Sequence, residues 1–326
     1  MPALIRKTLL ATLTLAALAA PARAQGVPEQ IVNALNKVWG SHPGFRAAHA
    51  TGVVVEGTFT PTPQAAALSK AVIFAGSAIP ITVRFSDGSG APALPDGDPH
   101  SNPHGMAIKF HLPGGADADV VTNAFKSFPV ATGEDFRDLL NALAVSGPTA
   151  PKPTAADTFI AAHPSVAKAF GTLATPSSLA RETYNGINAF IFVNAAGARQ
   201  PFRFRLDPVA GNDYLTPAEA AKQPQKFLMQ ELPARLAHEK VEFKLMAQLA
   251  NPGDPTNNAT IAWPADRKLV EMGTVTITRT VANSDVAQRT LLFLPTNVPT
   301  GIEPSDDPLI ETRAEAYAVS FSRRSQ

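Results

Sequence analysis

The sequence of 326 residues contains no cysteine. A chain without thiols has no disulfide, no cysteine-held zinc site or iron–sulfur cluster, no covalently attached c-type haem and no thiol nucleophile. Its stability must therefore come from the burial of apolar side chains. Because 45% of its residues are hydrophobic, a chain of this length can bury a large core without covalent cross-links.

Long apolar runs are also lacking. The longest, residues 8–20, is shorter than the roughly 18 residues that a membrane-spanning helix needs. It follows two basic residues and precedes the pattern Ala22-Arg23-Ala24, which is the layout of a secretory signal peptide. We therefore predict that residues 1–24 are a signal peptide and that residues 25–326 form a single domain, exported to the periplasm or secreted.

Concentrated positive charge and several common catalytic motifs are absent as well. Removal of residues 1–24 takes away three basic residues and changes the formal net charge from +1 to 1 − 3 = −2. No long basic block remains, so nucleic acid is not an expected partner. The chain has no G-x-S-x-G, H-E-x-x-H or G-x-x-x-x-G-K-[ST] sequence, and the hydrolase and P-loop templates that depend on these motifs are excluded.

Hydrophobic periodicity predicts many strands with inserted helices. Runs bounded by Gly, Pro, Asp and Asn clusters predict strands at residues 49–59, 79–86, 105–112, 118–123, 188–194, 201–206 and 270–278. Helices are predicted at residues 28–39, 134–147, 155–174 and 220–250, and around Tyr317. These elements indicate an α+β fold, an antiparallel β-barrel that is closed or nearly closed, with surrounding helices.

Two histidine patterns could carry chemistry. His100 and His104 share a loop with Asp96 and Asp98 at metal-like spacing, but the prolines that precede both histidines prevent a regular helix, so a metal site is not expected there. His49 opens a predicted strand, where an imidazole can point inward as a general base. The alternative for His49 is an ordinary buried core histidine.

The last helix, ETRAEAYAVSFSRR at residues 311–324, carries a tyrosine between arginines. Arg313 lies one helical turn before Tyr317 and Arg324 about two turns after it, so both guanidinium groups could flank the phenol. Positive charge beside a phenol favours its ionised form. The alternative is a basic helix end that complements the helix dipole, with Tyr317 as a half-buried aromatic.

Five motifs, taken together and in this order, resemble the haem catalase family in its short form, the catalase-related peroxidases. They are RAAHATG (46–52), VRFSDGSG (83–90), NPHGMAIKF (102–110), DVVTNAFKSF (119–128) and GIEPSDDPLIETRAEAY (301–317). The resemblance extends from about Gly44 to Arg324, nearly all of the predicted mature chain. It implies a catalase-like barrel with haem b, bound without a covalent link, buried between barrel and helices.

On the distal side of the haem, the resemblance implies that His49 and Asn123 are the catalytic pair. Ser86 would hydrogen-bond the ring of His49 and fix its tautomer. Phe128 and Phe136 match the aromatic residues that cover the distal face and line the access route.

On the proximal side, the resemblance implies that Tyr317 binds the iron as a phenolate, in the family pattern R-x-x-x-Y. Arg313 and Arg324 match arginines near that ligand and the haem rim. Arg46 and Arg84 match the arginines that bind the haem propionates.

The chain departs from the family pattern at several positions. His104 stands where catalases usually have arginine, Lys126 falls near the distal side, and Ala48 replaces a bulkier valine beside His49. The match ends near Arg324, so neither the helical C-terminal domain of long catalases, nor its nucleotide site, nor the interlocked tetramer is expected.

These features imply a peroxidase that reduces hydrogen peroxide, and organic hydroperoxides too, with a small organic electron donor and with weak catalase activity. The alternatives are a true catalase, a fatty-acid hydroperoxide isomerase and a periplasmic haem carrier without turnover. We expect a monomer or a small homo-oligomer with no membrane insertion.

Overall fold

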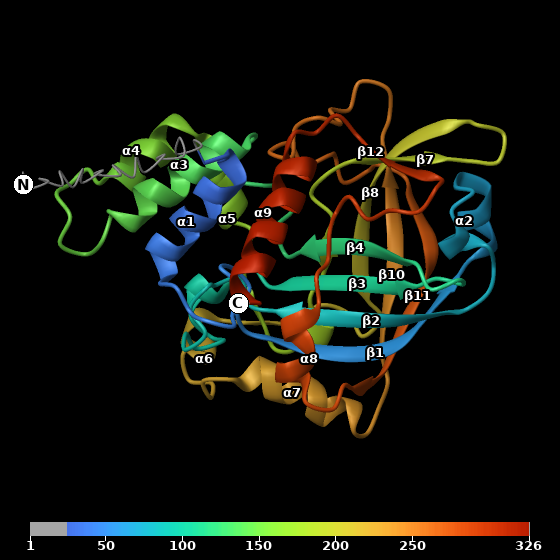
Figure 1. Ribbon diagram of the computed structural model, residues 1–326, viewed down its shortest axis with the longest axis horizontal. Helices are drawn as coiled ribbons and strands as arrows, with labels where there is room; N and C mark the ends of the chain where they lie inside the picture. The colour runs from blue at the N-terminus through green and yellow to red at the C-terminus, as the bar shows by residue number, and fades with distance from the viewer. Residues whose placement is uncertain (1–24, 326) are drawn as a thin grey trace, which may run out of the picture.

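The largest element of the structure, a computed structural model that describes residues 25–325, is an antiparallel β-barrel (Figure 1). Eight strands follow one another around the ring, and pairing between β8 and β10 closes it. In ring order they are β10 (Val241–Leu249), β11 (Leu269–Thr280), β1 (Gly52–Pro61), β2 (Ile79–Ser86), β3 (Gly105–His111), β4 (Asp117–Asn123), β6 (Tyr184–Asn185) and β8 (Arg199–Pro208). The expected α+β barrel with surrounding helices is confirmed.

One predicted helix is wrong over its last part. Residues 220–250 contain a helix, α7 (Phe227–Leu236), but Val241–Leu249 form strand β10. Val241, Phe243, Leu245 and Ala247 are buried and alternate with less buried residues, which is the period of a strand and not of a helix. Pairing with β11 on one side and β8 on the other makes this strand the one that closes the barrel.

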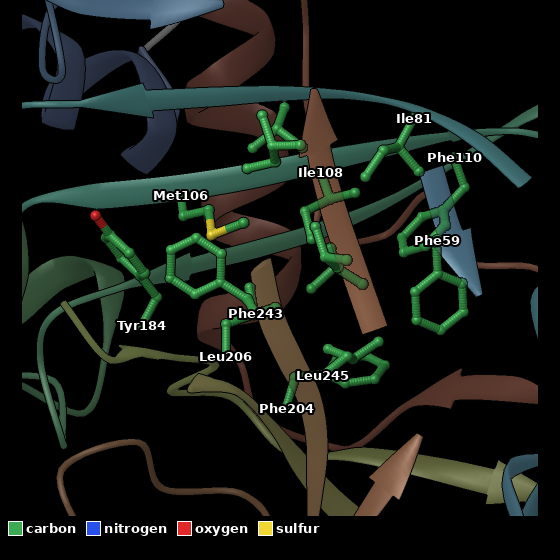
Figure 2. Packing of buried hydrophobic residues seen from close by; sticks show 14 of the residues in the cluster. Phe59, Ile81, Met106, Ile108, Phe110, Tyr184, Phe204, Leu206, Phe243 and Leu245 are labelled. Carbon is green, nitrogen blue, oxygen red and sulfur yellow. The ribbon is translucent and has the colours of Figure 1, made fainter. Parts of the chain in front are cut away.

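The inside of the barrel is filled by side chains (Figure 2). Phe243 packs against Phe85 with ring centroids 5.9 Å apart and against Tyr184 at 6.0 Å. The Tyr184 hydroxyl donates to the carbonyl oxygen of Leu179 at 2.8 Å, which satisfies the only polar atom of that side chain. The interior of a barrel of eight strands is just wide enough for side chains to fill, and here side chains fill it, so a large ligand must bind outside it.

A layer of helices lies against one side of the barrel (Figure 1). Its members are α1 (Val27–Trp39), α3 (Gly133–Ala144), α4 (Ala155–Ala162), α5 (Pro164–Phe170) and the last helix, α9 (Leu309–Arg324). Ile31 and Leu35 of α1, Leu140 of α3 and Ala316 of α9 pack into one apolar cluster. The predicted helix at residues 155–174 is two helices, because Pro164 starts a new one.

Shorter elements complete the fold. They are α2 (Pro63–Leu68), α6 (Pro217–Ala220), α8 (Ser284–Thr290), β5 (Thr175–Pro176), β7 (Phe190–Val193), β9 (Tyr214–Leu215) and β12 (Ile302–Pro304), with 3₁₀ turns at Val72–Phe74, Pro99–Ser101 and Leu179–Arg181. Within residues 25–325 no helix is both long and apolar enough to cross a membrane. The predicted signal peptide, residues 1–24, lies outside the described residues.

Candidate active site

A cavity of about 900 Å³ lies between the helical layer and the barrel. Residues of α1, α3, α5 and α9 line it together with the ends of the barrel strands β2, β3 and β4. All ten residues that the sequence predicted for the site are in its wall: Arg46, His49, Arg84, Ser86, Asn123, Phe128, Phe136, Arg313, Tyr317 and Arg324. Residues from both ends of the chain therefore share one cavity.

His49 is held by a segment at the end of β2. Its main-chain N–H donates to the carbonyl oxygen of Gly88 at 3.1 Å, and its Nδ1 lies 3.0 Å from Ser86 Oγ. Its backbone has φ of 56°, a left-handed conformation that side chains other than glycine rarely adopt. The sequence predicted that His49 begins a strand, but it precedes β1 by three residues and faces the cavity outside the barrel.

A row of residues across three strands forms the floor beneath the His49 ring. Gly105 of β3 pairs with Ser86 of β2 on one side and with Asn123 of β4 on the other. A Cβ atom on Gly105 would lie 3.1 Å from His49 Cε1 and 3.0 Å from Ser86 Oγ, so a larger residue would displace the ring or the hydroxyl. The sequence analysis did not identify Gly105, although a glycine at the start of a strand often marks such a close approach.

The environment of His49 keeps its ring neutral. Burial, followed by the charge of Arg84, lowers the pKa of His49 from 6.5 to about 3. Arg84 Nη2 also donates to the carbonyl oxygen of His49 at 2.8 Å, which fixes the backbone. A neutral imidazole has one unprotonated nitrogen and can therefore accept a proton from a bound molecule.

Tyr317 presents its phenol to the same cavity from α9. Arg313, one turn earlier, donates to the Tyr317 hydroxyl from Nε at 3.2 Å and from Nη2 at 3.1 Å. Arg313 also hydrogen-bonds Asn188. The predicted contact of Arg313 with the phenol is therefore present, whereas Arg324 donates to the carbonyl oxygens of Arg289 and Leu291 and flanks Phe321 instead.

Three arginines bring positive charge to one part of the cavity wall. Arg46 and Arg324 both donate to the carbonyl oxygen of Leu291, and Arg84 donates to Gln288 Oε1. Burial lowers the pKa of all three, that of Arg84 to about 9 and that of Arg324 to about 10. Among the described residues none of these arginines forms a salt bridge with a carboxylate, so their charges can hold an anionic ligand group.

These residues fit a haem. The cavity is large and mostly lined by apolar side chains, its arginines can pair with propionates, and the Tyr317 oxygen is available to an iron. The ring centroids of Phe128 and Phe136 lie 5.1 Å apart in the aromatic part of the cavity wall. Asn123 holds the turn after β4 by accepting from the N–H of Phe125 at 2.9 Å.

The other polar candidates do not come together around a metal. His100 is exposed and bonds Asp98 at 2.8 Å, whereas His104 is fully buried, with Nε2 3.6 Å from Asp87 Oδ1. Lys126 is exposed. Within residues 25–325 no group of three or more histidine or acidic side chains could hold a metal ion. The sequence analysis missed Asp87, although it directly follows the predicted Ser86.

The chain is similar in sequence to a known protein family and to two named relatives. The family model for catalase matches residues 43–325. A catalase-related peroxidase of Mycolicibacterium paratuberculosis is 37% identical over 301 residues, which cover 91% of this chain and 94% of the relative. A catalase-related peroxidase of Synechococcus elongatus is 32% identical over 303 residues, which cover 92% of this chain and 89% of the relative.

The fold is also similar to that of a solved structure. A crystal structure of a fungal catalase superimposes with a TM-score of 0.77 at 18% sequence identity and covers 87% of this chain. The chain spans 60% of that catalase. This likeness concerns the fold alone.

The two buried histidines predict a loss of stability in acid. Burial lowers the pKa of His104 to about 4, and that of His49 falls to about 3, so the unfolded chain binds more protons below the ordinary value of 6.5. The contribution of these two histidines to the free energy of unfolding should therefore fall as the pH drops from 6.5 toward 4. Urea unfolding of the haem-free chain across this range measures the effect.

His104→Asn should reduce the slope of the free energy of unfolding against pH, because the difference in bound protons between the unfolded and folded chains becomes smaller by about one. The exposed His238 supplies the control, since His238→Asn should leave the slope unchanged. An unaltered slope in the His104→Asn variant would mean that His104 is already charged in the folded chain.

Proposed function

The chain belongs to the catalase family, and on that basis we propose that it is a haem-dependent peroxidase that reduces hydrogen peroxide with an organic electron donor. It is an oxidoreductase that acts on peroxide. The observation that carries the proposal is that His49, Asn123 and Tyr317 line one cavity, together with arginines that can bind propionates.

Haem b is the proposed cofactor. Tyr317 would bind its iron, with Arg313 stabilising the phenolate through the two hydrogen bonds to its oxygen. Arg46, Arg84 and Arg324 would hold the propionates. When bound, the haem supplies the redox-active iron at which the O–O bond of the peroxide is reduced.

The protein's own residues would handle the protons. His49, neutral and oriented by Ser86, would take the proton of one peroxide oxygen and return it to the other peroxide oxygen, which would leave as water. The Asn123 amide would hydrogen-bond the peroxide beside it. Complete reduction of hydrogen peroxide consumes two electrons and two further protons and yields two molecules of water, and the electrons come from the donor.

Access to the site supports an organic donor over rapid oxygen release. Ala48 lines the cavity next to His49, where its small side chain leaves room beside the reacting atoms. Apolar residues of α5 and its neighbours, among them Val166, Phe170 and Leu173, also line the cavity and suit organic donors or hydroperoxides. Weak catalase activity is therefore part of the proposal.

Dissolved oxygen, measured after hydrogen peroxide is added to the haem-loaded protein with and without a phenolic or dye donor, tests the proposed activity. We expect peroxide consumption mainly when the donor is present. Ala48→Val should lower donor oxidation relative to oxygen release, because valine narrows the space beside His49. Rapid oxygen release without a donor would identify a true catalase instead.

Lipid hydroperoxides distinguish a further alternative. An epoxide or ketol product from a fatty-acid hydroperoxide, formed without a donor, would identify a hydroperoxide isomerase. Reduction of the same compound to its alcohol at the expense of a donor supports the peroxidase.

His49→Ala separates an enzyme from a haem carrier. We expect this variant to take up haem as the unsubstituted chain does and to lose peroxide consumption by about 10²–10⁴-fold, the usual contribution of a general acid–base residue. His238→Ala, at an exposed position, is the control. Equal peroxide consumption by His49→Ala and by the unsubstituted protein would favour a haem carrier.

Export is a separate part of the proposal. We propose that residues 1–24 are removed and that residues 25–326 act as one domain in the periplasm, as a monomer or small homo-oligomer. N-terminal sequencing of the protein from a periplasmic fraction should begin at Gln25, and light scattering gives the oligomeric state. A cytoplasmic protein that retains residues 1–24 would overturn the assignment.

A further inference from the structure

Two buried aspartates lie behind the segment that holds His49. Asp87 is 2% exposed and Asp96 is not exposed at all, and their side chains hydrogen-bond each other. His104, also fully buried, lies 3.6 Å from Asp87 Oδ1 through its Nε2. Apart from this mutual contact, no residue between 25 and 325 donates a hydrogen bond to Asp87 Oδ1 or Asp96 Oδ1.

The contacts of the two carboxyl groups differ and assign one negative charge to the pair. Asp96 Oδ2 accepts from the main-chain N–H of Leu228 at 2.9 Å and of Met229 at 3.2 Å, and Lys226 Nζ lies 3.8 Å from Asp96 Oδ1. Burial raises the pKa of Asp96, but the two N–H donors and the nearby charge of Lys226 oppose this shift and stabilise the ionised form. Two carboxylates in contact can hydrogen-bond only if one keeps its proton, so that proton belongs to Asp87.

The electrostatics agree with this assignment. Burial, followed by the neighbouring Asp96, raises the pKa of Asp87 from 3.8 to about 8. The other charged groups around the pair are already engaged. Lys226 donates to Thr51 Oγ1 and to two carbonyl oxygens, and Arg84 donates to His49 and Gln288. His104 is neutral, because burial lowers its pKa to about 4.

Asp87 connects this pair to the catalytic histidine. It stands between Ser86, whose hydroxyl contacts the His49 ring, and Gly88, whose carbonyl oxygen accepts from the His49 N–H. The main-chain N–H of Asp87 donates to the carbonyl oxygen of Thr51 at 3.1 Å. Its side chain is therefore the buried anchor of the three-residue segment that orients His49.

We propose that Asp87 and Asp96 are positioning residues for the peroxide reaction, and that the proton they share holds Ser86, Gly88 and hence His49 in place. This inference rests on the proposed function of His49 as the acid–base residue. Loss of the shared proton leaves two like charges in contact away from water, which separates the side chains and moves the segment. The rate of peroxide consumption then falls at alkaline pH because the Asp87–Asp96 pair, which does not contact the substrate, loses its proton.

The first test compares pH profiles of peroxide consumption by haem-loaded proteins. The unsubstituted protein should lose up to about tenfold of its activity between pH 7 and pH 9, since the pair passes through a pKa of about 8 in this range. Asp87→Asn should lose much less activity than the unsubstituted protein between pH 7 and pH 8, below the pKa of about 9 of the neighbouring Arg84, because its amide donates to Asp96 at every pH. The same alkaline loss in Asp87→Asn, or no loss in the unsubstituted protein, would overturn the proposal.

Asp119→Asn is the matched control. Asp119 is a buried aspartate elsewhere in the barrel, hydrogen-bonded to Lys109 and Asn297, and its variant should keep the alkaline loss of the unsubstituted protein. Loss of the pH dependence in the control would attribute the effect to general destabilisation and would overturn the proposal.

A second arm uses the haem-free chain and does not depend on catalysis. An acid whose pKa is raised in the folded state binds more protons there, so its contribution weakens the fold as the pH rises from about 4 toward 8. The urea midpoint of Asp87→Asn, relative to the unsubstituted chain, should therefore be higher at pH 8.5 than at pH 5. If the urea midpoints of Asp87→Asn and the unsubstituted chain differ by the same amount at pH 5 and at pH 8.5, the proposal of a shared proton is wrong.

The two arms separate this inference from the proposed function. A haem-loaded protein that consumes no peroxide at any pH would overturn the proposed function, and the haem-free arm would still decide whether the pair shares a proton. Asp87→Ala removes the anchor altogether and should reduce peroxide consumption about tenfold or more at pH 7, with haem uptake unchanged. An Asp87→Ala protein as active as Asp87→Asn would overturn the positioning role.

Discussion

Closure of the barrel by β10 determines where chemistry can occur in this protein. The strand pairs with β8 and β11 at once, which closes the ring of strands around an interior filled by aromatic and aliphatic side chains. A ligand as large as haem then has space only outside the barrel. The ends of β2, β3 and β4 meet α1, α3 and α9 there, and the cavity forms between them.

The cavity places buried positive charge beside an uncharged proton acceptor. Buried arginines gather where anionic groups would bind, while the neutral ring of His49 lies over the uncharged row of Ser86, Gly105 and Asn123. Positive charge helps to keep His49 neutral, so the groups that would bind the cofactor also prepare the base.

Much of this arrangement could be predicted from sequence because short motifs carry it. Arg313 and Tyr317 meet through ordinary helical spacing, and the strands at residues 79–86 and 105–112 follow from their β-rich runs. The composition of strand β10 obscured it, since Leu, Met, Ala and Gln favour helices, although the alternation of Val241, Phe243 and Leu245 with Glu242 and Lys244 has the period of a strand. The left-handed backbone of His49 and the contact of Asp87 with Asp96 depend on tertiary pairing, which no local pattern encodes.

The pairing of β1 with β11 also governs when the fold can form. Val55 pairs with Thr280, a separation of 280 − 55 = 225 residues, so the first strand of the barrel finds one of its neighbours only after most of the chain has been synthesised. Folds dominated by such distant contacts assemble slowly and expose unpaired edges meanwhile. Until its final quarter emerges, the nascent chain exposes the unpaired edge of β1, and a truncation before Leu269 leaves a sheet that cannot close.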